Sequence, residues 1–143
     1  MNNFFTFLYE GFHPLDLFYI SNFSDDMHQT ETAYVTIGII MIFSSIILES
    51  AYYYVISNYG SFYKRKFWFL WLVIIALINF FMAYHFSVAT LQDYYSTLST
   101  PYPYTFTEHF TFSMVNVFWT VVFCFLFSVI LKFKSIQASR TPF

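Results

Sequence analysis

Residues 67–91 contain no Lys, Arg, Asp or Glu. About 20 apolar residues, each adding roughly 1.5 Å, are enough for a helix to cross a hydrocarbon core of about 30 Å. Lys64, Arg65 and Lys66 stand directly before this stretch. Basic residues beside an apolar helix favour the cytoplasmic side of a membrane. The stretch therefore predicts a transmembrane helix and also its direction.

Composition extends this prediction to the whole chain. Of its 143 residues, 58% are hydrophobic and 10% are charged, whereas soluble domains have about 45–50% and 25%. The length fits one domain, and a single cysteine excludes an internal disulfide. We expect an all-α integral membrane protein, with residues 1–143 forming one membrane domain in contact with the lipid bilayer.

Two further apolar stretches complete a set of three predicted spans. Residues 33–56 and 110–131 each match the length of a transmembrane helix. The connection at 57–66 is short, so the first two spans should form an antiparallel hairpin. Residues 92–109 should form a loop, because their two prolines remove backbone donors. At its end, Thr105 or Thr107 should cap the third span, with Glu108 at the positive end of the helix.

Residues 1–32 combine aromatic and acidic side chains and have no Lys or Arg. They lack the basic region and the cleavage site of a secretory signal peptide. A further span at 4–20 would bury Glu10 and Asp16, and a carboxylate at mid-bilayer costs about 2.5–3.5 kcal/mol. We therefore expect an amphipathic segment in the outer interface, broken near residues 11–14.

Charge segregation predicts the orientation of the three spans. All six basic residues lie in two segments, 64–66 and 132–140, which a three-span chain places on one side. The other side holds seven of the eight acidic residues. The positive-inside rule then puts the N-terminus outside and the tail at 132–143 in the cytoplasm or matrix. The predicted location is an inner membrane, either the cytoplasmic membrane of a bacterium or archaeon or the inner membrane of an organelle.

Each predicted span carries one narrow stripe of small or polar side chains. Such residues mark helix contacts in lipid, where apolar burial adds little. Ser45, Asn79 and Thr120 fall at nearly one depth, so we expect the stripes to face one another and Asn79 to bond to one of the two hydroxyls. Contacts with neighbouring subunits are the alternative. The stripes are Gly38, Ser45, Glu49 and Tyr52; Ala76, Asn79, Ala83 and Ser87; and Ser113, Asn116, Thr120 and Cys124.

Glu49 is the one charged residue inside a predicted span. Such residues are candidates for proton relays, ion ligands or counter-ions. Glu49 lies about seven residues from the inner end of its helix, or roughly 10 Å. We therefore favour an ion pair with Lys64, Arg65 or Lys66, or a contact with a partner subunit.

The histidines raise the question of a metal site on the outer side. His28, Asp25 and His109 are the candidate ligands, because imidazole and carboxylate suit zinc or copper. Their spacing matches no established metal motif, so the signal is weak. Tyrosines and tryptophans crowd both span ends, which is typical of aromatic belts at headgroup depth. A slot for a quinone or a lipid is the alternative interpretation of these rings.

No catalytic motif is present, and Cys124 lies mid-span among phenylalanines, where a thiolate is poorly solvated. The leading prediction is a small non-catalytic subunit of a larger inner-membrane complex, either energy-transducing or secretory. Its partners would be other integral membrane subunits, with bound lipid and no cofactor. A homo-oligomeric channel is the alternative, and a metal- or redox-binding subunit is a third hypothesis.

Overall fold

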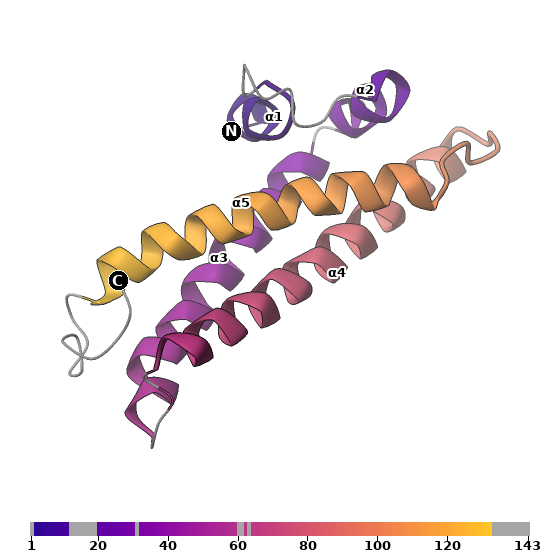
Figure 1. The fold of residues 1–143 in the computed structure, drawn as a ribbon. Coiled ribbons are helices and arrows are strands. Elements are labelled where there is room, and N and C mark those ends of the chain that lie inside the picture. The colour runs from indigo at the N-terminus through magenta and orange to yellow at the C-terminus, as the bar shows by residue number, and fades with distance from the viewer. Residues whose placement is uncertain (1, 12–19, 31, 60–61, 63, 133–143) are drawn as a thin grey trace. The chain divides into compact units, whose positions relative to one another are not determined.

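The computed structural model describes residues 2–11, 20–30, 32–59, 62 and 64–132. Within these residues it contains helices and no strand, and three of the helices are long and apolar enough to cross a membrane (Figure 1). This confirms the predicted all-α fold class with three candidate spans, and the N-terminal segment before them forms short helices. The elements are α1 (Asn2–Tyr9), α2 (Ser21–Gln29), α3 (Ala33–Tyr54), η1 (Ile56–Asn58), α4 (Arg65–Thr97) and α5 (Phe106–Lys132).

Two predictions fall partly on residues that the structure does not describe. The expected break near residues 11–14 lies outside the described residues except for Gly11. The expected tail at 132–143 lies outside them except for Lys132.

The second and third long helices extend beyond the stretches that predicted them. α4 covers 33 residues, a length of about 50 Å against a hydrocarbon core of roughly 30 Å. The absence of charge predicts only the part of a helix that lipid can surround. The helical backbone hydrogen bonds continue into the polar residues on either side, so the helix is longer than the uncharged stretch. The loop expected at 92–109 is therefore reduced to residues 98–105.

α4 ends in a backbone motif centred on Ser99. Its φ of 54° lies in the left-handed region, where glycine is usual. The Thr100 N–H donates to the Tyr95 carbonyl at 3.3 Å, and the Ser99 N–H donates to the Ser96 carbonyl at 3.2 Å. These two bonds satisfy carbonyls that a helix end otherwise leaves free. Two prolines follow and prevent the helix from continuing.

α5 begins at a capping contact between Thr105 and Glu108. The Glu108 carboxylate accepts hydrogen bonds from the Thr105 backbone N–H at 2.9 Å and from the Thr105 hydroxyl at 2.6 Å. Of the two threonines expected at this helix start, Thr105 is therefore the one bonded to Glu108. The carboxylate also lies at the positive end of the helix, where negative charge is stabilising.

The chain divides into two compact units, and α3, α4 and α5 each contribute a segment to both. The first consists of Met1–Ile40 and Phe80–Asn116. Its sequence contains no Lys or Arg and seven acidic residues, so we call it the acidic unit. The second consists of Met41–Asn79 and Val117–Phe143. Its sequence contains all six basic residues and one acidic residue, so we call it the basic unit.

In the acidic unit, α1 packs through Tyr9 against α3 and α5. The Tyr9 ring is fully buried, stacks on Tyr34 with centroids 5.6 Å apart, and lies 5.1 Å from Phe112. The Tyr9 hydroxyl donates a hydrogen bond of 2.7 Å to Oδ1 of Asn116. Burial raises the pKa of Tyr9, so the phenol stays protonated and can donate. The N-terminal segment thus contributes to the core of this unit.

Gly38 on α3 provides the space for a second side chain of α1. The Phe5 ring lies directly over Gly38, and a Cβ added there would overlap the ring. Phe5 is itself buried. Gly38 therefore allows close approach, as the small-residue stripe predicted, but its partner is a short N-terminal helix.

In the basic unit, tryptophan side chains connect the three long helices. The Trp68 indole N–H donates to the Ser128 hydroxyl at 3.2 Å, which connects α4 to α5. The Trp71 indole N–H donates to the Leu48 carbonyl at 3.0 Å, which connects α4 to α3. The aromatic residues at this end therefore include core residues as well as residues of the expected belt. The buried cluster comprises Tyr52, Tyr53 and Trp68.

The contact between Phe5 and Gly38 gives a test of this packing. Gly38→Ala should lower thermal stability in detergent, because overpacking costs about 1–3 kcal/mol. The helix propensity gained on replacing glycine by alanine offsets about 1 kcal/mol at most. The measurement is thermal unfolding followed by circular dichroism.

Phe5→Ala supplies the matched control background. Without the ring, Gly38→Ala should be neutral or stabilising, because only the gain in helix propensity remains. An equal loss of stability in both backgrounds would contradict the contact.

Candidate functional site

Nearly all the side chains of the three predicted stripes turn inward. Every one is buried except Ala76, which is half-buried. These residues therefore contribute to the interior of each unit. The acidic unit contains Gly38, Ala83, Ser87, Ser113 and Asn116, and the basic unit contains Ser45, Glu49, Tyr52, Ala76, Asn79, Thr120 and Cys124.

Asn79 bonds across helices to the hydroxyl of Ser44, which the sequence did not single out. Its Oδ1 accepts from the Ser44 hydroxyl at 2.7 Å, and its Nδ2 donates to the Ile75 carbonyl at 3.1 Å. The Ser45 hydroxyl instead donates to the Met41 carbonyl of its own helix at 2.7 Å. A serine within a helix readily bonds to the carbonyl four residues back, so depth alone did not identify Ser44 as a partner of Asn79.

Glu49 is fully buried, with 0% of its side chain exposed. Neither carboxylate oxygen has a hydrogen-bond partner among the described residues, although Ser128 and Cys124 are polar neighbours. Within the described residues, Glu49 does not form the expected ion pair with Lys64, Arg65 or Lys66. All three basic side chains are exposed. An ionised carboxylate costs several kcal/mol in such surroundings, so the uncharged acid fits this position.

The three candidate metal ligands have different surroundings. Asp25 lines a hollow in the acidic unit, and His28 lines another with Glu10. His109 is buried. Within the described residues, no group of three His, Cys, Asp or Glu side chains is placed to hold a metal ion.

Both ring nitrogens of His109 have hydrogen-bond partners. Nδ1 lies 2.9 Å from the Ser87 hydroxyl, and Nε2 contacts the Tyr102 hydroxyl. The Ser87 hydroxyl donates to the Tyr84 carbonyl at 2.9 Å, so it accepts from Nδ1–H of His109. Nε2 then accepts from Tyr102, whose pKa burial raises to about 12. This network is consistent with a neutral imidazole ring for His109, with the proton on Nδ1. Both ring nitrogens already have hydrogen-bond partners within the chain.

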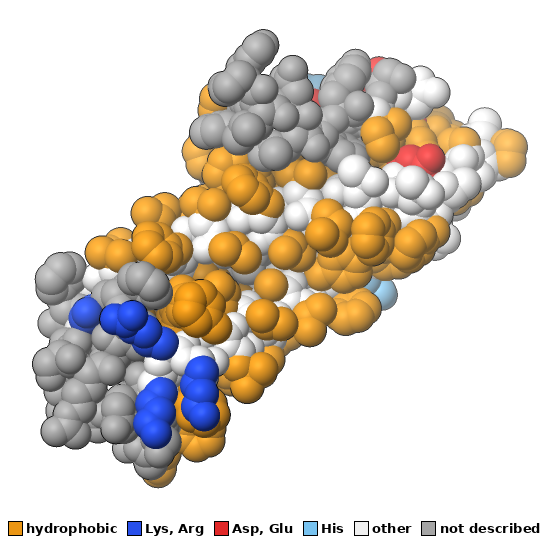
Figure 2. All heavy atoms as spheres, in the orientation of Figure 1, with side chains coloured by type: hydrophobic (Ala, Val, Ile, Leu, Met, Phe, Trp, Pro, Cys, Tyr) orange, Lys and Arg blue, Asp and Glu red, His pale blue; other side chains and the backbone are white. Residues whose placement is uncertain are grey.

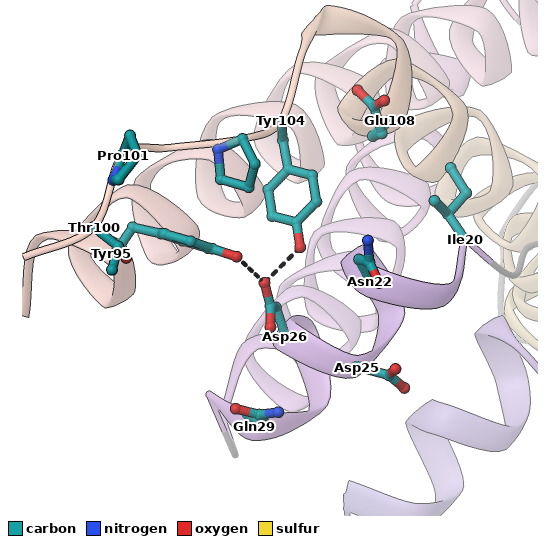
Figure 3. A pocket seen from close by; sticks show the side chains of 11 residues that line it. Ile20, Asn22, Asp25, Asp26, Gln29, Tyr95, Thr100, Pro101, Tyr104 and Glu108 are labelled. Carbon is teal, nitrogen blue, oxygen red and sulfur yellow. Dashed lines mark hydrogen bonds between the residues drawn. The ribbon is translucent and has the colours of Figure 1, made fainter. Parts of the chain in front are cut away.

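A polar hollow lies in the acidic unit, with a volume of about 770 Å³ (Figure 3). Two phenol groups point at the same carboxylate oxygen: Tyr95 and Tyr104 each donate to Oδ2 of Asp26 at 2.5 Å. Burial and the Asp26 carboxylate raise the pKa of Tyr104, so it remains a donor. The hollow is lined by Ile20, Asn22, Asp25, Asp26, Gln29, Tyr95, Thr100, Pro101, Pro103, Tyr104 and Glu108.

The hollow joins parts of the chain that are far apart in sequence. α2 contributes Asp26, the last turns of α4 contribute Tyr95, and the following loop contributes Tyr104. The sequence placed all three on the outer side but did not pair them. Their shared predicted location was the available signal, because tyrosines beside an acidic helix can donate to its carboxylates.

The fold and these sites define a small helical membrane protein with three candidate spans. Comparison of the chain with protein-family models, curated proteins and solved structures finds no match.

Glu49 gives a second test. Glu49→Gln should change the free energy of unfolding by less than about 1 kcal/mol, because an uncharged acid with no hydrogen bond loses little on conversion to an amide. Asn79→Leu is the matched control and should cost about 1–2 kcal/mol through loss of the bond to Ser44. Thermal unfolding in detergent measures both. A loss of about 3–5 kcal/mol in Glu49→Gln would indicate a broken buried ion pair instead.

Proposed function

We propose that this protein is a non-catalytic integral membrane subunit that packs within a larger assembly of an inner membrane. The observation that carries the proposal is the division of its side chains. Small and polar groups of the spans are enclosed within each unit, whereas large apolar groups face outward. A chain of this kind offers contact surfaces to lipid and to neighbouring helices, and no catalytic constellation accompanies them in the described residues.

The outward face of α4 in the basic unit illustrates such a surface. Phe69, Val73 and Leu77 recur every four residues, and each has more than half of its side chain exposed. Residues four apart lie on one side of a helix, so the three form a continuous apolar stripe. Lipid covers such a stripe in an isolated chain, and a neighbouring helix covers it in an assembly.

The acidic hollow supports a partner of opposite charge. Asp25, Asp26 and Glu108 line it, and the sequence of the acidic unit contains no Lys or Arg to balance them. A basic segment of a neighbouring subunit would complement these carboxylates. Such complementarity directs partner choice more than it adds affinity.

A homo-oligomeric channel fits the polar residues less well. A pore needs hydrophilic side chains along an open water path. Asn79 and Asn116 instead hydrogen-bond within the chain, and Glu49 is fully enclosed.

The assembly is tested by purifying the tagged full-length chain from its own membrane in mild detergent. We expect it to elute with other membrane subunits in constant ratio. Asp25→Lys, in the hollow, should reduce their recovery, whereas Asp93→Lys, an exposed acidic residue outside the hollow, should not. Elution of the wild-type chain alone, or only with copies of itself, would overturn the proposal.

The orientation is tested by cysteine labelling in a Cys124→Ala background. Thr100→Cys should react with a membrane-impermeant maleimide added to intact cells or organelles stripped of their outer membrane. Lys64→Cys should react only after permeabilisation, because the positive-inside rule predicts that the basic residues 64–66 lie inside. Both positions are exposed in the chain, so the reverse pattern would mean the opposite orientation.

A further inference from the structure

A small apolar groove lies in the basic unit, between the end of α3 and the start of α4. Its volume is about 190 Å³. Pockets that enclose a drug-sized ligand are typically about 300–1,000 Å³. This groove is smaller, and its size suits part of a single hydrocarbon chain. Its walls are Tyr52, Ile56, Phe62, Phe67, Leu70, Trp71 and Ile74.

The polar atoms of the two aromatic walls are already bonded within the chain. The Tyr52 hydroxyl donates to the Phe62 carbonyl at 2.9 Å, and the Trp71 indole N–H donates to the Leu48 carbonyl at 3.0 Å. The two rings stack with centroids 6.5 Å apart. The groove therefore presents ring faces and hydrocarbon, and its chemistry selects an apolar occupant.

Positive charge borders this groove. Lys64, Arg65 and Lys66 directly precede its wall residue Phe67 and are exposed. The Lys66 ammonium lies 5.1 Å from the centre of the Phe67 ring. Figure 2 shows Lys and Arg side chains of the described residues gathered on the surface at one end of the basic unit. The one Asp or Glu in the sequence of this unit is Glu49, which is fully buried, so no acidic side chain of the unit offsets the three cations at the surface.

We propose that this groove binds an anionic phospholipid of the surrounding bilayer. One acyl chain lies against Tyr52, Trp71 and Leu70, and the phosphate lies beside the basic triplet. An apolar slot next to uncompensated cations matches a molecule with a hydrocarbon tail and a negative head. In the sequence, the positive-inside rule is enough to explain the basic triplet. The groove beside the triplet adds a second role, which is to bind the lipid phosphate.

This occupant fits better than a protein partner. An acidic peptide would satisfy the cations but leave the apolar slot unfilled, and an apolar helix would fill the slot but leave the cations unpaired. Basic residues at a membrane surface attract anionic lipids, and the bilayer supplies them at high local concentration. The proposal does not depend on a larger assembly, because the groove and its basic border belong to one chain.

The test is native mass spectrometry of the purified full-length chain with added phosphatidylglycerol or phosphatidylcholine of the same acyl chains. We expect about tenfold or greater preference for phosphatidylglycerol, because the triplet attracts the anionic head. The variant Lys64→Gln/Arg65→Gln/Lys66→Gln should abolish this preference. Equal binding of the two lipids to the wild-type chain, or an unchanged preference in the variant, would overturn the proposal.

A second pair of variants separates the groove from general surface charge. Leu70→Trp places a larger side chain at the groove wall and should reduce binding of both lipids. Leu126→Trp lies on α5 of the same unit, is similarly exposed (50% against 57%), and does not line the groove, so it should bind both lipids as the wild type does. Unchanged binding in Leu70→Trp would mean that surface charge alone attracts the lipid, and would reject the groove.

Discussion

Polar groups within the spans must find partners inside the protein, because hydrocarbon offers none. Most of the internal architecture follows from this constraint. Asn79 bonds to Ser44 across α3 and α4, and Trp68 bonds to Ser128 across α4 and α5. In water such bonds would compete with solvent and discriminate weakly between packings. In lipid, an unpaired partner costs several kcal/mol, so each bond restricts how its helices can pack.

Glu49 departs from this pattern, because its carboxyl group is buried with no hydrogen-bond partner among the described residues. The uncharged acid is the form with the lower cost there, so Glu49 behaves as a polar core residue of the basic unit. The triplet at 64–66 is then free to act outward, and the adjoining groove directs it towards lipid. The ion pair expected from the sequence would have given Glu49 and the triplet a single shared role, whereas the structure separates a buried carboxyl group from three exposed cations.

The acidic unit shows how an N-terminal segment of aromatic and acidic residues becomes part of a helical core. Tyr9 of α1 supplies the hydrogen bond that Asn116 needs, and Phe5 fills the space left by Gly38. α2 brings Asp26 to two tyrosines from the far end of α4 and its loop. The sequence of this unit contains no Lys or Arg to balance the carboxylates of the hollow, which is why we propose a partner of opposite charge for it.

The sequence by itself determined the helical class, the three spans and the segregation of charge, because lipid requires long uncharged helices and each of these properties is local. It also identified which faces turn inward, since small and polar residues recur at helical spacing. Only the tertiary structure decided the partners: Ser44 for Asn79, Tyr9 for Asn116, Phe5 for Gly38, and Ser87 with Tyr102 for His109. Partner choice depends on the rotation of each helix and on which hydroxyls are already bonded to their own backbone, and neither is a property of a single segment.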